Sequence, residues 1–94
     1  MTRQELENLL GTLEGIDSSK IKSVLQEAFG TKNTEELRGH LKKTDMNSPH
    51  ELLWAVQVIW TNPGCYKVKN RRALQVGLEM IPPQARSDMA RAAK

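Results

Sequence analysis

The stretch that decides the fold covers residues 48–64, which read SPHELLWAVQVIWTNPG. Ser48 is a favourable N-cap, Pro49 suits the first helical position because its missing N–H costs nothing there, and Glu51 completes a capping box. Apolar side chains then cover nearly every face of the predicted helix, which ends at an Asn-Pro-Gly turn. A helix that is apolar all round lies in the centre of a domain or under a partner. We therefore expect a central apolar helix near residues 49–61.

Amphipathic stripes on both sides of this stretch predict further helices and no strand. We expect the first helix to start at Thr2 and end at Gly15, the second to span Asp17 to Gly30, and the third to start at Asn33 or Thr34. A fifth helix is expected at about residues 70–81, and Pro83 opens a sixth. Few apolar positions follow, so residues 83–94 are expected to dock loosely. The predicted fold class is all-α, a compact single bundle of five or six short helices over residues 1–94.

Length and cysteine content restrict the class of protein. Ninety-four residues and 10.6 kDa suit one domain. The longest apolar stretch is far shorter than the ~20 residues that a membrane-spanning helix needs. The one cysteine, Cys65, excludes an intrachain disulfide framework and a cysteine-rich zinc site. We therefore expect a reducing, cytoplasmic compartment.

Groups that could carry catalysis are sparse in this sequence. A nucleophilic site would need Cys65 together with His40 or His50 and a carboxylate, and no local pattern pairs them. The two histidines belong to different predicted helices, so metal ligands do not gather at close spacing. Neither of the glycine-rich phosphate-binding motifs occurs. We expect no enzyme activity, no cofactor, no metal ion and no small-molecule substrate.

Positive charge is concentrated in the second half of the chain. The net charge is +3 overall, but residues 1–47 hold seven Lys/Arg and eight Asp/Glu, which gives −1. Residues 48–94 hold seven Lys/Arg and three Asp/Glu, which gives +4. Such an excess indicates contact with nucleic acid, an anionic lipid surface or an acidic partner. The alternative is a solvated face that only keeps the protein soluble.

The densest basic segment follows the central helix. The candidate residues for binding anionic lipid or nucleic acid are Lys67, Lys69, Arg71 and Arg72, with Arg38, Lys42 and Lys43 added if the third helix packs beside them. Each basic residue near an anionic membrane is worth about 1 kcal/mol, so such a cluster would be useful. Tyr66, beside it, can stack on a base or lie at a lipid interface.

Two tryptophans in the central helix are candidates for contact with a partner. Trp54 and Trp60 are six positions apart, so they point to different sides of the helix. We expect one ring in the core and the other half exposed as a contact anchor, because tryptophan is enriched in interface hot spots. The alternative places both rings in the core. Tyr66 is the third candidate for partner contact.

Two segments resemble a viral family. Val56-x-Val58-Ile59-Trp60, followed six residues later by Lys67-Val68-Lys69, resembles the fourth-helix region of primate lentiviral Gag matrix proteins. Lys20-Ile21-x-Ser23-Val24-Leu25, followed by Thr31 and Glu36-Leu37, is similar to an earlier helix of that family. The matches cover about a third of the chain. The stretch from Trp60 to Ile81 is also similar to a helix pair in retroviral capsid domains.

The resemblance to Gag matrix implies a bundle of about five helices and a structural role in viral assembly. It implies docking on anionic membrane through a basic face, contact with RNA, and a position at a membrane or in a virion. Only Lys67 and Lys69 match positions that the resemblance places at lipid head groups. Residue 2 is threonine, so the Met-Gly signal for myristoylation is absent.

The leading functional prediction is a non-enzymatic assembly domain that binds anionic membrane or RNA through its basic surface. The alternative is a small helical adaptor whose protein partner covers part of the central helix. A protein partner or self-association is expected under either hypothesis.

Overall fold

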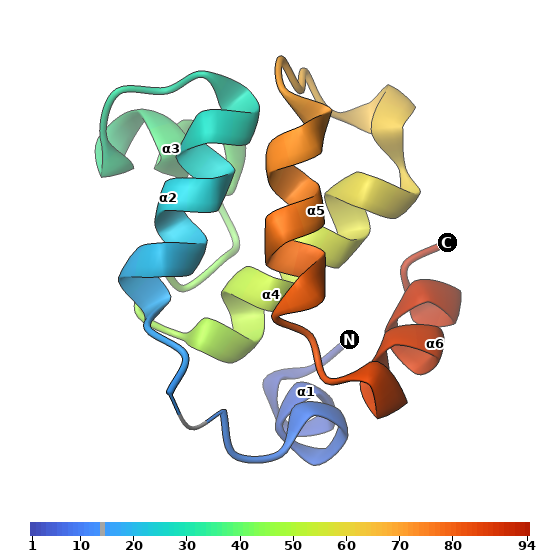
Figure 1. Ribbon diagram of the computed structural model, residues 1–94. Helices are drawn as coiled ribbons and strands as arrows, with labels where there is room; N and C mark the ends of the chain where they lie inside the picture. The colour runs from blue at the N-terminus through green and yellow to red at the C-terminus, as the bar shows by residue number, and fades with distance from the viewer. Residues whose placement is uncertain (14) are drawn as a thin grey trace.

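The computed structural model describes residues 1–13 and 15–94, and these residues form helices and no strand. The prediction of an all-α bundle is confirmed. The helices are α1 (Arg3–Leu10), α2 (Ser18–Phe29), α3 (Thr34–His40), α4 (Pro49–Thr61), α5 (Arg71–Glu79) and α6 (Pro83–Ala92), with a short 3-10 helix, η1 (Pro63–Cys65), between α4 and α5. In Figure 1, α2 and α5 run side by side, α4 crosses behind them, and α1 and α6 lie together at the lower end.

Four helices begin at the N-caps that the sequence predicts. The side-chain oxygens of Thr2, Asp17, Asn33 and Ser48 each accept a hydrogen bond from a backbone N–H of the first turn. Such a bond satisfies a donor that has no partner within the helix. At the other end of α2, Gly30 adopts a left-handed conformation (φ 70°), as predicted for a residue that ends a helix.

The first helix is shorter than predicted. It ends at Leu10, with Gly11 at φ 64° as its C-cap, and does not continue to Gly15. His50 at the start of α4 approaches the Gly11 carbonyl oxygen at 2.8 Å from Nε2 and holds this end against the bundle. Leu13, which lies within the predicted helix, packs against the core from outside α1.

The predicted capping box at the start of α4 is only half formed. The Ser48 hydroxyl accepts from the Glu51 N–H. The Glu51 carboxylate does not return to Ser48, because it accepts a hydrogen bond from the Asp45 N–H and lies 3.5 Å from the Arg3 guanidinium. Glu51 therefore links the α3–α4 connection and α1 to the central helix.

The central position predicted for α4 is confirmed. This helix packs against α1, α2, α5 and α6. Its buried residues are Leu52, Leu53, Ala55, Val56, Gln57 and Ile59. The near-continuous apolar sequence is therefore explained by neighbours inside the same chain on several sides.

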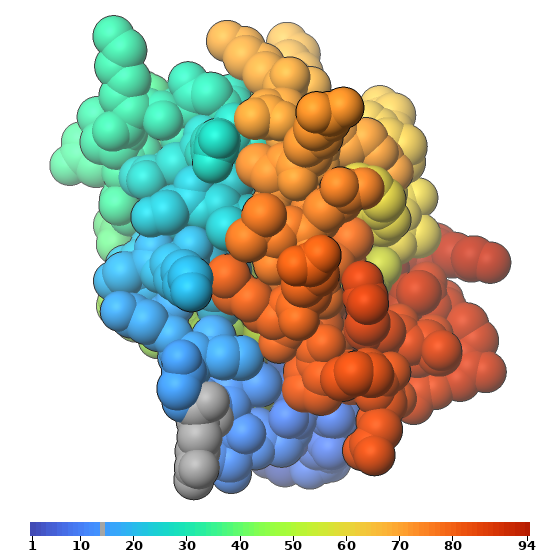
Figure 2. Space-filling model, viewed as in Figure 1, coloured from blue at the N-terminus to red at the C-terminus, as the bar shows by residue number. Residues whose placement is uncertain are grey.

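The contact of α5 with α2 and α4 depends on a glycine. A Cβ atom built on Gly77 would lie 3.0 and 3.1 Å from the two methyl carbons of Val56 and 3.3 Å from a methyl carbon of Val24. The missing side chain thus allows close approach of the three helices, and Figure 2 shows α2 and α5 in contact along one face. The helix is slightly shorter than predicted, and Ile81 is buried just after its end.

The last helix is docked more closely than predicted. α6 packs on α4 and α1 and buries Ala85 and Met89. Its small side chains let the helix approach the bundle, and Met89 is 0% exposed. The Asn62 amide N–H donates to the Ala93 carbonyl at 2.6 Å and ties the end of α6 to the end of α4. Loose docking of residues 83–94 was therefore a wrong expectation.

We predict opposite effects for alanine at two helical glycines. Gly77→Ala gains about 1 kcal/mol of helix propensity. It also forces a methyl group against the buried, rotationally stiff Val56, and overpacking of this kind costs about 1–3 kcal/mol. We expect the free energy of unfolding to fall by up to about 2 kcal/mol in urea titrations.

The matched control is Gly39→Ala in α3, where nothing lies within 4 Å of the added Cβ. This variant should keep or gain stability, by at most about 1 kcal/mol. Equal stabilisation by both substitutions would contradict the close packing at Gly77.

Candidate functional site: a basic surface around Tyr66

The predicted basic residues come from two segments that the fold brings together. Lys67 and Lys69 lie in the connection between η1 and α5, and Lys42 and Lys43 follow α3. The connection is held at the end of α2, because the backbone N–H groups of Lys69 and Asn70 both donate to the Ala28 carbonyl, at 2.8 and 2.9 Å. Since α3 also packs on α2, both basic segments meet at one end of that helix.

Tyr66 marks the place where the two segments meet. It is partly buried and lines a hollow of about 380 Å³ with His40, Lys42 and Lys43. The remaining lining comes from Gly39, Leu41 and Thr44. An aromatic ring from one segment therefore shares a concave surface with two cations from the other. We expect from the sequence that Lys42 and Lys43 lie near the basic segment if the third helix packs beside it. In the structure both lysines line one hollow with Tyr66.

A second hollow adjoins the same histidine. It also measures about 380 Å³, and its lining includes His40, Lys67, Lys69 and Glu36. The carboxylate of Glu36, in the first turn of α3, accepts a hydrogen bond from the Lys32 N–H at 2.9 Å and is thereby held against the turn before that helix. The second hollow therefore carries mixed charge, whereas no acidic residue stands among the described residues that line the first.

His40 is held in position by a ring contact. Its imidazole stacks on Phe29, with the ring centroids 4.5 Å apart and the planes at 11°. Phe29 is buried at the end of α2 and so fixes the exposed His40 residue between the two hollows. From the sequence alone, His40 is a candidate only for catalysis or metal binding. Phe29 ends α2 and His40 ends α3, so the stack joins two separate helices and no local pattern in the sequence marks it.

Lys69 has a structural role as well as a charge. A Cβ atom on Gly30 would lie 2.9 Å from the Lys69 Cδ, so the lysine stem rests on the glycine that ends α2. A cation beside the C-terminal end of a helix is favourable because the last carbonyls are electronegative. Lys69 therefore contributes to holding the connection in place, and Lys67 is the freer of the two lysines.

Arg71 is engaged with the central helix. Its guanidinium carbon lies 3.8 Å from the centroid of the Trp60 ring, and its Nη2 donates to the Trp60 carbonyl at 3.0 Å. Arg71 therefore anchors the start of α5 to the end of α4. Arg72 and Arg38 are exposed and lie outside the residues that line the two hollows.

Neither tryptophan is fully buried. Trp54 and Trp60 are both partly buried and pack on the edge of the core, which differs from the expectation of one core ring. Trp54 lines a hollow with Lys43 and residues of α1.

The other chemical candidates lie apart from this surface. Cys65 is exposed in η1. Within residues 1–13 and 15–94, no group of three or more His, Cys, Asp or Glu side chains is placed to hold a metal ion. Over the same residues, no helix combines the length and the apolar character needed to cross a membrane.

Comparison with known proteins yielded no relative. No family model, no curated protein and no solved structure matches this chain.

We predict that the neighbouring arginines Arg71 and Arg72 differ in their effect on stability. Arg71→Ala removes the ring contact and the hydrogen bond to Trp60, and a cation–π contact at a partly exposed site is worth about 0.5–1 kcal/mol. We expect the free energy of unfolding to fall by about 1 kcal/mol and the fluorescence of the tryptophans to change. Arg72→Ala at the next position serves as the control, and it should leave the free energy of unfolding and the tryptophan fluorescence nearly unchanged. Equal losses would show that Arg71 acts through net charge alone.

Proposed function

We propose that this chain is a non-enzymatic binding domain that takes single-stranded RNA on the surface formed by Lys42, Lys43, Lys67, Tyr66 and His40. The observation that carries the proposal is that the Tyr66 ring shares one hollow with Lys42 and Lys43, two cations from a distant segment of the chain. Single-stranded nucleic acids bind where a basic groove follows the backbone and aromatic rings stack on bases.

Each part of the surface has a place in this function. Lysine ammonium groups neutralise phosphates and release counterions, which makes binding dependent on salt. Tyr66, and His40 on its Phe29 support, present flat rings at which bases can stack. This combination favours an unpaired strand, because bases in a duplex already stack on one another.

An anionic membrane is the second candidate, and the distribution of apolar side chains argues against it. Among the described residues, the exposed large hydrophobic side chains are Met1 and Val76, and neither lines the surface around Tyr66. Contact with lipid would therefore rest on charge, with no apolar side chain to insert. A role in viral assembly, as the resemblance to Gag matrix implies, is compatible with RNA binding and stays a prediction.

The test is fluorescence anisotropy with a labelled polyuridine RNA, at low and at physiological salt. We expect binding that weakens steeply with salt and is lost in Lys42→Glu/Lys67→Glu. The control Lys20→Glu/Lys94→Glu changes the net charge equally at exposed positions outside the two hollows and should bind nearly as wild type. Tyr66→Ala should lose about 1–3 kcal/mol of binding free energy, while Tyr66→Phe keeps the ring and the affinity.

Two results would contradict the proposal. The first is equal loss of binding in both charge-reversal variants, which would indicate attraction to net charge only. The second is binding to phosphatidylserine vesicles without binding to RNA, which would make the surface a membrane contact.

A further inference from the structure

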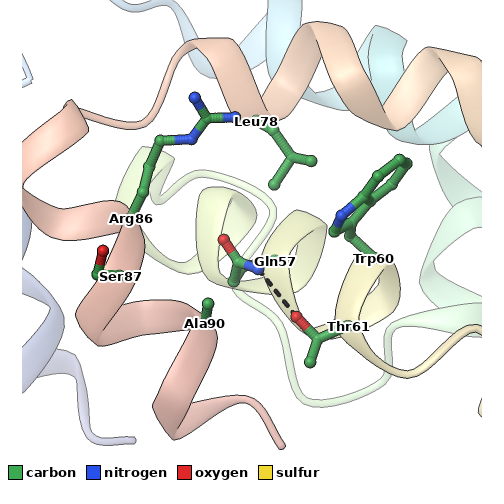
Figure 3. Close-up of a pocket in the computed structure, with 7 residues that line it drawn as sticks. All are labelled: Gln57, Trp60, Thr61, Leu78, Arg86, Ser87 and Ala90. Carbon is green, nitrogen blue, oxygen red and sulfur yellow. Dashed lines mark hydrogen bonds between the residues drawn. The ribbon is translucent and has the colours of Figure 1, made fainter.

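A groove beside the central helix is lined by residues that take no part in the basic surface. It measures about 450 Å³ and lies between α4, α5 and α6. Trp60, Leu78 and Ala90 supply apolar lining, and Gln57, Arg86 and Ser87 supply polar groups (Figure 3). These residues come from three helices, so the groove exists only in the folded bundle.

Gln57 is the unusual member of this lining. It is a buried amide, 4% exposed, in a helix whose other buried residues are apolar. Its Nε2 donates to the Thr61 Oγ1 at 2.9 Å. Its carbonyl oxygen accepts no hydrogen bond from a described residue, and in Figure 3 it faces away from Thr61 into the space beside Arg86 and Leu78.

A buried amide whose oxygen faces an open groove is suited to an external donor. The Gln57 oxygen is not among the fully buried side-chain atoms without a partner, so it stays accessible from the groove, whereas the rest of the amide is desolvated at a cost in free energy. An apolar residue would fill this core position without that cost, as on the rest of α4. The Gln57 oxygen therefore offers an acceptor for an N–H group that enters the groove.

The charge around the groove is positive. Arg86 is exposed and forms no ion pair within residues 1–13 and 15–94, whereas Arg91 on the same helix pairs with Asp88. Arg71 places a second guanidinium on the Trp60 ring. No acidic side chain is among the described residues that line the groove. An occupant with a carboxylate would therefore complement it.

We propose that the groove binds an acidic peptide segment of a partner protein. A main-chain N–H of the peptide donates to the Gln57 oxygen, an Asp or Glu carboxylate meets the Arg86 guanidinium, and an apolar side chain packs on Leu78, Ala90 and the edge of Trp60. A peptide supplies the donor, the negative charge and the apolar side chain together. A nucleic acid strand would bring phosphates to a site with one free cation among its described lining residues.

The experiment is selection of a random twelve-residue peptide library displayed on phage against the full chain. We expect the recovered peptides to share a carboxylate next to a large apolar residue. Synthetic copies should shift the amide resonances of Gln57, Trp60 and residues of α6 in NMR titrations. Recovery of no binding peptide, or of peptides that shift only residues around Tyr66, would overturn the proposal.

Matched variants test the individual contacts of the selected peptides. Arg86→Gln should weaken their binding about tenfold, the usual loss when one charged hydrogen bond is removed. Arg91→Gln makes the same chemical change on the same helix and should have little effect. Gln57→Met keeps the length of the side chain but removes the acceptor, and should weaken peptide binding severalfold. Unchanged affinity in both Arg86→Gln and Gln57→Met would overturn the proposal.

Failure of the groove proposal and failure of the RNA proposal are distinguishable. Polyuridine binding should be unchanged in Gln57→Met, because Gln57 lies outside the lining of both hollows near Tyr66. Peptide binding should survive Tyr66→Ala for the same reason. The fold of each variant is checked by its thermal unfolding and its dispersion of NMR resonances.

Discussion

The close approach of α5 to α2 and α4 at Gly77 is the contact on which the rest of the bundle depends. Hydrogen in place of a side chain lets the helix backbone reach the methyl groups of Val56 and Val24. Interiors of proteins are packed as densely as organic crystals, so an added methyl group has no free space to enter. The position of α5 follows from this contact. Both candidate surfaces depend on this position. The groove is lined in part by Leu78 of α5, and Tyr66 and Lys67 lie in the connection that leads into α5.

The connection before α5 shows how a core contact positions surface chemistry. With α5 held against α2, the connection that precedes it reaches the Ala28 carbonyl, where two backbone N–H groups bind. Lys69 then rests on Gly30, and Tyr66 lies opposite Lys42 and Lys43. Arg71 completes the attachment by stacking on Trp60. Two of the predicted binding residues, Lys69 and Arg71, thus hold in place the connection that carries Tyr66 and Lys67.

The two candidate sites share no lining residue and differ in their chemistry. The surface around Tyr66 combines several cations with flat rings, and no exposed large hydrophobic side chain is among its described lining residues, which suits a flexible polyanion. The groove beside Gln57 has apolar walls, one buried acceptor and one free guanidinium among its described residues, which suits a short peptide. A small domain with both features could join a nucleic acid to a protein partner, and each site could be altered without changing the other.

Local signals in the sequence determined the helices, because caps, prolines and apolar spacing act within a few residues: Ser48-Pro49 marks the start of α4 in the sequence and in the structure. The basic residues could likewise be named in advance. Their roles could not, because the stacking of Arg71 on Trp60 and of His40 on Phe29 joins residues of different helices. The end of α1 at Gly11 and the docking of α6 were also decided by tertiary contacts, through His50 and Asn62. Sequence pattern records which face of a helix is apolar, whereas packing decides which faces meet and what lies in the hollows between them.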